Sequence, residues 1–570
     1  MKRILNNKIY KYVACACVVL SCFTACKKDY LTFDIYEGVV DEDDIWENDR
    51  FARSVLNVAY NGLQYRYDLG EGALLADASD EAVISQPNNP VLTMTNGTWG
   101  PGNVFDDRYT ALYTALRTTN LFLEKAPKSA ILPVSDINPL RGQAFFLRAF
   151  YHFELMKRYG RIVLATRVFD KDENLDLPRN TVDEVVSLIK NDCDSAAAYI
   201  PAIWNGTGTT TSNGENWDTG NRGRATKAAA LALKSRVLLY YASPQYNPLQ
   251  DIQRWKDAAE AAKAVIDLNK HSLVTTANYP RLFNYSNAAT LYNAEVIFAT
   301  TAVNTNAIES NNAPVGFNGG KGRTNPTQEL VDAFDMSNGK ERLDPTSNYS
   351  DNNPYANRDA RLALFIVTNG SQYKTGSLTR TVETFEGGAD KIDKPTDKIF
   401  ATKTGYYLRK FTSDAVTFAG STGLVSQRRP WVLFRYAEIL LNYAEALNES
   451  DGDVTAIYSA INAVRRRANP SFPLLAGLSK LERTNRIRKE RQVELCFEEH
   501  RFFDVRRWKL GEQVFNKPVS GMKISKLANN SYTYQRVTVE NRVFDPRNYL
   551  YPISQNELNR SPKLEQNPHY

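Results

Sequence analysis

The sequence is poor in the residues on which most catalytic and metal centres depend. Its 570 residues include 4 His, 5 Met and 6 Cys. Histidine is the side chain that titrates near neutral pH and a common metal ligand, so its scarcity argues against a histidine-based site. No G-x-S-x-G, H-E-x-x-H, C-x-x-C or EF-hand spacing occurs. We therefore expect no enzyme and no cofactor; a structural calcium ion stays open, although no motif supports one.

A phosphate-binding loop is also missing, despite a glycine-rich segment at residues 316–327. The P-loop spacing requires Ser or Thr after the lysine, but Lys321 is followed by Gly322, and no apolar strand leads into the segment. We interpret it as a flexible ligand-binding loop, with Phe317 and Arg323 as candidate contacts.

Long apolar runs are absent except for one short stretch near the start. Four positive residues and then the stretch Val13–Ala25 form a pattern typical of a secretory signal, too short for a comfortable membrane span. Small residues precede Cys26, as at the end of a bacterial lipoprotein signal, so Cys26 is the predicted lipid-anchored residue. Cys22 is the rival site, and a plain secretory peptide is the alternative. We expect residues 1–25 to be removed.

Excess charge is missing from the predicted mature chain. Residues 1–25 carry four positive charges and no negative ones, so their removal lowers the formal charge from +6 to +2. Such a chain lacks the broad basic field of nucleic-acid-binding proteins, and no nucleic-acid partner is expected. Only Cys193 and Cys496 remain after removal of the signal and lipidation of Cys26. We expect both to be buried free thiols; a disulfide between them is the alternative.

Helical periodicity dominates what the sequence does contain. Gly160 is placed to end one helix, Thr181 to begin the next, and Tyr532–Val539 reads as a strand. The fold class is therefore mainly α, with long polar loops between the helices. The predicted helices span Arg108–Ala126, Arg141–Tyr159, Val182–Ile200, Thr226–Ala242, Trp255–Leu268, Leu433–Asn448 and Val454–Ala468.

The densest patch of charge and aromatic residues is Arg488–Trp508 ("RKERQVELCFEEHRFFDVRRW"). Glu494 lies three residues from Arg491, and Glu498 lies three residues from Arg501, which are spacings that make ion pairs along one helix. A metal site would need ligands from several segments, and one His does not suffice. We interpret the stretch as a scaffold helix, with a partner surface or a metal site as the alternatives.

The candidate ligand contacts lie in the loops instead. Trp99 stands between Gly97 and Gly100, close to Asn103, and Trp217 lies in a second Gly-rich loop. An indole face can stack on a sugar ring while amides bond its hydroxyls, so we predict glycan contact, with packing as the alternative.

An acidic cluster around Asp80 and Glu81 is the other candidate. Turn and helix-cap chemistry is the common use of such residues. They could also bind peptide termini together with Arg323, or serve a glycosidase, since the separation of paired carboxylates is set by tertiary structure.

Several sequence motifs follow one another in a recognisable order along nearly the whole chain. They are Cys26–Leu31, Arg141–Leu164, Pro326–Gly339, Arg435–Glu449, Ile461–Ala468, Glu490–Trp508 and the C-terminal "YLYPISQNEL" and "QNPHY". Together they resemble the SusD/RagB family of outer-membrane lipoproteins, with His569 where Gly is usual in that family.

The resemblance implies a SusD-like fold over residues 26–570, in which about four tetratricopeptide-like helical pairs support a loop-rich region, with a RagB/SusD-type half at about 300–570. It implies a non-catalytic, lipid-anchored protein on the surface of a Gram-negative outer membrane. Such a protein captures glycan and delivers it to a SusC-like TonB-dependent transporter; capture of peptides is the alternative. The identity of the ligand and the loops that form its site stay open.

Overall fold

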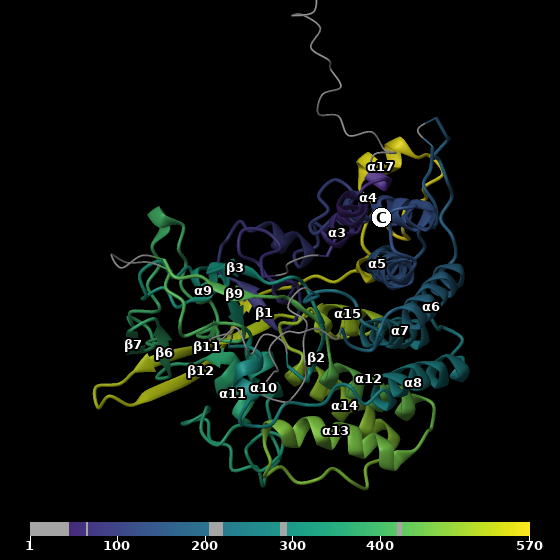
Figure 1. Ribbon diagram of the computed structural model, residues 1–570. Helices are drawn as coiled ribbons and strands as arrows, with labels where there is room; N and C mark the ends of the chain where they lie inside the picture. Colours follow the sequence, from purple (N-terminus) through teal and green to yellow (C-terminus); the bar gives the residue numbers. More distant parts are fainter. Residues whose placement is uncertain (1–44, 64–66, 171, 205–220, 285–292, 419–423) are drawn as a thin grey trace, which may run out of the picture.

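The computed structural model describes residues 45–570 except 64–66, 171, 205–220, 285–292 and 419–423. The predicted signal, both candidate lipidation sites and Trp217 lie outside the described residues. A helical layer on one side supports a loop-rich lobe on the other (Figure 1). The prediction of a mainly α-helical chain is confirmed.

The helical layer is built from helices that pack on one another in chain order. Every consecutive pair from α3 to α8 is in contact, and α3 also packs on α5. Buried aromatic and aliphatic side chains of these helices form the main core. The layer consists of α3 (Asp49–Tyr60), α4 (Tyr109–Lys125), α5 (Val134–Tyr159), α6 (Val182–Tyr199), α7 (Lys227–Ala242) and α8 (Ile252–Asp267).

Local signals explain where these helices begin and end. Thr181 caps α6, and Glu184 completes a capping box by accepting the Thr181 backbone N–H. Gly160 follows α5 with φ 69°, a conformation that costs glycine little. The N-terminus of α5 was predicted at Arg141, but the helix begins at Val134 and passes through Pro139.

A second group of helices continues the layer. It comprises α12 (Tyr436–Glu449), α13 (Val454–Ala468) and α14 (Lys480–Glu494). The bounds of α13 are as predicted. The helix α12 packs on both α8 and α13, and Ala437 and Ala444 on α12 and Ala258 and Ala262 on α8 are buried.

The loop-rich lobe contains two-stranded antiparallel sheets that join segments far apart in the sequence. Leu433 to Arg435, predicted as the start of a helix, belong to a strand instead. The pairs are β1 (Ala82–Ile84) with β4 (Thr324–Pro326), β2 (Val296–Ala299) with β10 (Val432–Arg435), β3 (Val303–Thr305) with β9 (Gln427–Arg429), β5 (Ile366–Val367) with β8 (Tyr407–Leu408), β6 (Gln372–Thr375) with β7 (Leu378–Thr381), and β11 (Val519–Lys526) with β12 (Tyr532–Glu540).

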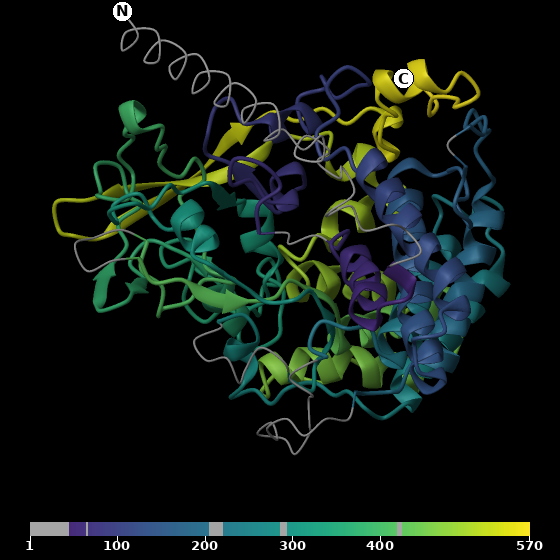
Figure 2. The ribbon, with the colours of Figure 1, turned by 45° about the horizontal axis from the view of Figure 1, so that its top comes forward.

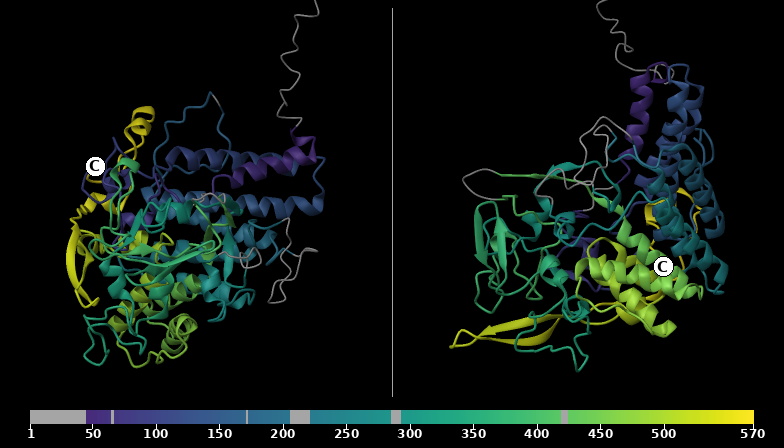
Figure 3. Two further views of the ribbon diagram at one scale, coloured as in Figure 1. Left: turned by 90° about the vertical axis from the view of Figure 1, so that its left-hand side faces the viewer. Right: turned by 60° about the horizontal axis from the view of Figure 1, so that its bottom comes forward.

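Short helices complete the lobe and the C-terminal part. The β11–β12 hairpin projects from the lobe on the side away from α6 and α8, and the C-terminal segment returns to α4 and α5 (Figures 2 and 3). The short helices are α9 (Ala307–Asn312), α10 (Gln328–Ala333), α11 (Ala360–Phe365), α15 (His500–Arg507), α16 (Gly511–Val514) and α17 (Gln555–Arg560).

The charged stretch Arg488–Trp508 is a scaffold element, but it is not one helix. It forms the end of α14 and all of α15, joined by a turn in which Phe497 and Glu499 have φ 63° and 67°. Such left-handed conformations are unfavourable for residues other than glycine, and no Gly or Pro marks the break in the sequence.

The predicted intrahelical ion pairs of this stretch are wrong. The Glu494 side chain, fully buried, pairs with Arg435 at 2.7 Å, Arg361 at 3.0 Å and Arg467, which come from three other segments. Tyr279 also donates a hydrogen bond to Glu494 at 2.8 Å. The charges therefore join α14 to the rest of the fold rather than stabilising the helix alone.

Candidate functional site

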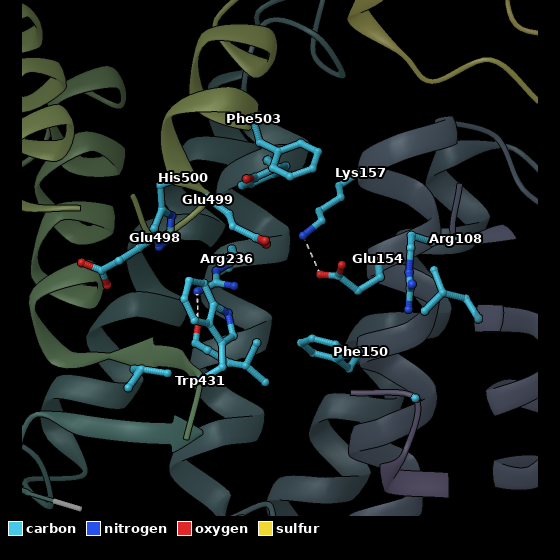
Figure 4. A pocket seen from close by; sticks show the side chains of 15 residues that line it. Arg108, Phe150, Glu154, Lys157, Arg236, Trp431, Glu498, Glu499, His500 and Phe503 are labelled. Atoms are coloured by element: carbon cyan, nitrogen blue, oxygen red, sulfur yellow. Dashed lines mark hydrogen bonds and ion pairs between the residues drawn. The ribbon is translucent and has the colours of Figure 1, made fainter. Parts of the chain in front are cut away.

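The described residues line an internal cavity and two open grooves that bear on function. The cavity lies between α4, α5 and α7 of the helical layer and the segments 431–433 and 498–503. In Figure 4, Lys157 pairs with Glu154 at 2.6 Å, and Glu499, His500 and Phe503 approach from the opposite side. The cavity is thus a polar seam between the two parts of the fold.

This cavity is too small for a sugar. Its volume is about 40 Å³, which accommodates a few water molecules at most. His500 is buried there, and burial together with the charges of Arg236 and Arg491 holds its pKa well below the usual range, so the imidazole stays neutral. The seam is suited to internal hydration rather than to ligand capture.

An open groove of about 500 Å³ lies on the outside of the helical layer. We call it the tyrosine groove, because Tyr109 and Tyr113 of α4 form part of its wall. Residues 163–170, residues 175–177 and the C-terminal part of the chain around α17 supply the other sides. Its lining combines aromatic and aliphatic side chains with charged and amide groups at the rim: Tyr109, Tyr113, Asn120, Val163, Ala165, Phe169, Leu175, Leu177 and Leu564, with Thr110, Thr114, Arg117, Arg167, Asp170, Glu557, Arg560 and Ser561.

Hydrogen bonds hold the walls of the tyrosine groove in place. The Tyr113 hydroxyl donates to the Val163 carbonyl at 2.8 Å, and the Asn120 amide donates to the Ala165 carbonyl at 2.8 Å. These bonds attach the segment 163–169 to α4. On the other side, Thr110 donates to Glu557 at 2.8 Å and so connects α4 to α17. The groove is therefore largely preformed.

The aromatic rings of the groove are held in defined positions. The rings of Tyr109 and Tyr113 are 4.8 Å apart, and the Arg167 guanidinium lies over the Phe169 ring at 4.4 Å. Burial raises the pKa of Tyr109 to about 12 and that of Tyr113 well above its usual range. Both phenols therefore stay neutral at physiological pH, with flat apolar rings beside a polar rim.

The structure corrects the exposed position predicted for Trp99. Its indole is 1% exposed and packs edge-on against Tyr551, with ring centroids 4.6 Å apart. The loop is closed by contacts with the C-terminal segment, in which Arg547 donates to the Gly97 carbonyl at 3.0 Å. An indole so covered offers no face to a sugar. Asn103 is exposed, and its side chain accepts a hydrogen bond from the Gly100 N–H within the same loop.

The acidic cluster is likewise part of the structure's interior. Asp80 forms a two-pronged pair with Arg501 at 2.7 and 2.8 Å. Glu81 is 1% exposed, and burial together with the charge of Asp80 raises its pKa to about 8. Neighbouring Asp77 accepts the Leu74 N–H at 2.9 Å, which is the turn and cap chemistry expected of such a cluster.

The glycine-rich loop is folded inward as well. Phe317 is 2% exposed and packs against Tyr373, with the Arg380 guanidinium 4.2 Å above its ring. Arg323 is 9% exposed and bonds the Gln86 side chain. Trp99 and Phe317 are both buried, so they do not form the exposed aromatic face on which the glycan prediction depends. Trp217, the third aromatic of that prediction, lies outside the described residues.

Sequence reasoning missed the tyrosine groove because its walls are far apart in the chain. Tyr109 and Tyr113 fall within the predicted helix Arg108–Ala126, where their spacing marks them as positions on its apolar side. The sequence carries no signal for the groove, because nothing in it shows that residues 163–170, 175–177 and 557–564 lie beside that helix.

Neither a metal centre nor a membrane span appears in the described ranges. No group of three or more His, Cys, Asp or Glu side chains there is placed to hold a metal ion. None of the helices there combines the length and the apolar character needed to cross a membrane. Cys193 and Cys496 are both buried free thiols, as predicted.

The layered helices, the loop-rich lobe and the open grooves define a helical scaffold protein with preformed grooves on its surface. Comparison with known protein families identifies the family to which this scaffold belongs. A sequence model of the SusD family matches residues 294–570, and one described as "Starch-binding associating with outer membrane" matches residues 54–239. The chain belongs to the SusD/RagB family.

Individual relatives agree with this assignment. SusD-like protein P2 of Formosa agariphila is 26% identical to this chain over 390 residues, which cover 67% of each chain. SusD-like protein P38 of the same organism is 23% identical over 558 residues, which cover 94% of each chain. A crystal structure of a SusD-like protein from Bacteroides fragilis is 28% identical with a TM-score of 0.77 and covers 93% of this chain and 99% of that one. A SusD-like carbohydrate-binding protein from the same organism shares the fold at 23% identity, with a TM-score of 0.72 over 91% of this chain and 100% of that one.

Proposed function

We propose that this protein is a non-catalytic glycan-binding lipoprotein of the outer-membrane surface, and that it binds oligosaccharide in the tyrosine groove. The observation that carries the proposal is the pairing of the partly exposed Tyr113 and Phe169 with a rim of amide and charged groups in one preformed hollow, with Tyr109 buried behind them. Small-molecule sites typically have apolar walls and a few placed polar groups. The names of the relatives agree, since one neighbour in fold is described as carbohydrate-binding.

The chemistry of a sugar ring matches this surface. One face of a pyranose presents C–H groups that pack on an aromatic ring, while hydroxyls around the edge need hydrogen-bond partners. Tyr113 and Phe169 supply the rings. Arg117, Arg167 and Thr114 are exposed at the rim and supply partners for the hydroxyls.

The carboxylates at the groove support binding without hydrolysis. Asp170 and Glu557 line it. Glu557 is engaged by Thr110 at 2.8 Å and by Arg560 at 3.6 Å, and Asp170 is exposed. Neither occupies the buried apolar surroundings that keep a general acid protonated near neutral pH.

The proposal includes a lipid anchor at Cys26 and delivery of captured glycan to a SusC-like TonB-dependent transporter. The small residues before Cys26 and the outer-membrane association in the description of one family model support this part. Acylation supplies a reversible hold on the bilayer, and a second chain or signal makes it stable.

The proposal is tested by titrating the purified protein with a panel of oligosaccharides in a calorimeter. We expect at least one glycan to bind, and Tyr113→Ala to weaken it about tenfold, as loss of a stacking ring does at a binding hot spot. Tyr113→Phe keeps the ring and should bind almost as the natural protein does.

Tyr199→Ala is the matched control, because Tyr199 lies on α6 away from the groove and is 36% exposed. Thermal unfolding of each variant shows whether it is folded. No binding anywhere in the panel, or unchanged binding by a folded Tyr113→Ala protein, overturns the proposal.

A further inference from the structure

A second open groove, of about 420 Å³, lies where α10, α14 and the segment around α16 meet. We call it the α14 groove. Three cations and two carboxylates line it, together with two side-chain amides and the Trp508 indole. The lining is Glu329, Asp332, Ala333, Asn485, Arg488, Lys489, Gln492, Arg501, Trp508, Leu510 and Val514.

Both carboxylates of the groove already have partners. Glu329 and Asp332 each pair with Arg536 of β12 at 2.7 Å. Asp332 also pairs with Arg342 at 3.2 Å, and Glu329 accepts the Ser520 N–H at 2.9 Å. These acids are therefore neutralised from outside the groove and repel an incoming anion only weakly.

Two of the three cations are also neutralised. Lys489 pairs with Asp335 at 2.7 Å and with Glu341 at 3.1 Å. Arg501 pairs with Asp80 at 2.7 Å. Arg488 differs: within the described part of the chain, its guanidinium makes no hydrogen bond or ion pair. Glu445 and Glu449 attract this charge from a distance, but among the described residues it is the one cation of the groove that no direct ion pair neutralises.

Arg488 is nevertheless held in position. Its guanidinium lies over the Trp508 ring at 5.0 Å, and the Trp508 N–H donates to Glu445 at 2.7 Å, which fixes the ring. A stacked guanidinium keeps its N–H groups pointing outward from the ring edge, ready for a carboxylate. Arg488 is also half-buried, and desolvation of its charged guanidinium lowers its pKa. A bound anion would restore the stabilisation that the charge loses on leaving water.

Two amides complete the surface on the same face of α14. Asn485 precedes Arg488 by three positions and Gln492 follows it by four, so all three side chains project to one side of the helix. Each amide offers both a donor and an acceptor, and neither makes a hydrogen bond within the described residues. Vicinal hydroxyls of a sugar require that combination.

We propose that the α14 groove is a second saccharide site, specific for a sugar that carries a carboxylate, such as a uronic acid. Arg488 receives the carboxylate through two parallel N–H···O bonds, and Asn485 and Gln492 bond neighbouring hydroxyls. The choice of a saccharide rests on the proposed function, whereas the requirement for a carboxylate rests on Arg488 alone.

The test is calorimetric titration of the purified protein with trigalacturonate at neutral pH and low salt. We expect binding that weakens as salt is added. Arg488→Gln should raise the Kd at least about tenfold, since it removes a bidentate charged contact. The methyl ester of the same trisaccharide should bind the natural protein as weakly as trigalacturonate binds the variant.

Lys489→Gln is the matched control: it removes one positive charge from the same groove, but a charge that Asp335 already neutralises, and we expect less than about a threefold change. Unfolding midpoints show that both variants are folded. Absence of trigalacturonate binding, equal effects of the two variants, or binding of a peptide with a free C-terminal carboxylate instead of trigalacturonate each overturns the inference.

The two proposals fail separately. Binding of a neutral glycan that depends on Tyr113, without binding of trigalacturonate, removes the α14 site and leaves the tyrosine groove. If trigalacturonate binds in a way that depends on Arg488, and Tyr113→Ala changes the binding of no glycan, the α14 site stands and the tyrosine groove is ruled out.

Discussion

The two faces of α14 use the same kinds of residue in opposite ways. On the inner face Glu490, Arg491 and Glu494 are buried, and each is paired with charges from other segments. On the outer face Arg488 and Gln492 are partly exposed and line an open groove. The difference shows that neighbouring elements, and not residue type, decide whether a charge holds the fold or is free to bind a ligand.

Aromatic residues repeat the contrast. Trp99 and Phe317 lie in glycine-rich loops but are covered by the C-terminal segment and by the lobe, whereas Tyr113 lies on a regular helix and faces an open groove. A glycine-rich loop is therefore no guarantee of exposure, and a regular helix can present an aromatic ring to a groove.

The largest effect should come from the inner face. Glu494→Ala removes the carboxylate shared by Arg361, Arg435 and Arg467 and leaves three buried cations without their common partner. We expect the free energy of unfolding to fall by about 3–5 kcal/mol. Arg488→Gln on the outer face should change it by less than about 0.5 kcal/mol. Denaturant unfolding of both variants measures the contrast, and similar losses would remove the distinction between the faces.

A smaller effect should appear in the pH dependence of stability. Burial alone would raise the pKa of Glu494, but the charges of Arg467, Arg435 and Arg361 hold it well below the usual range. Its contribution is therefore present above the pKa of the unfolded chain and is lost in acid. Glu81 has the opposite sign, because its pKa is raised to about 8 and the folded state keeps a proton that the unfolded chain releases.

Glu81 should therefore cost stability as the pH rises from about 5 to about 8. We expect Glu81→Gln to reduce that decline by at least about 1 kcal/mol, since the amide has no charge to bury. Unfolding curves at several pH values check this. An unchanged pH profile would mean that Glu81 is ionised in the folded protein.

Much of the fold could be predicted from local signals. The capping residue Thr181, the terminal Gly160 and the periodicity of Val454–Ala468 act over a few residues, and the structure agrees with each of them. The break after Glu494 could not be read, because the left-handed residues there, Phe497 and Glu499, are held by tertiary contacts rather than by turn chemistry.

The site was the part that the sequence could not place. A loop such as that of Trp99 reads as exposed until the C-terminal segment is known to cover it, as the bond between Gln555 and the Pro101 carbonyl shows. The tyrosine groove forms where α4, residues 163–170 and 175–177, and α17 meet. The residues that join them are separated in sequence by about fifty to more than four hundred positions.

Hydrogen–deuterium exchange with and without a glycan that binds tests the central claim most directly, because it locates the ligand without a mutation. We predict that a bound neutral oligosaccharide slows exchange in residues 109–125, 163–177 and 555–564, which form the tyrosine groove. Slowed exchange confined to the lobe, such as residues 306–326, with no change along α4, would contradict the account.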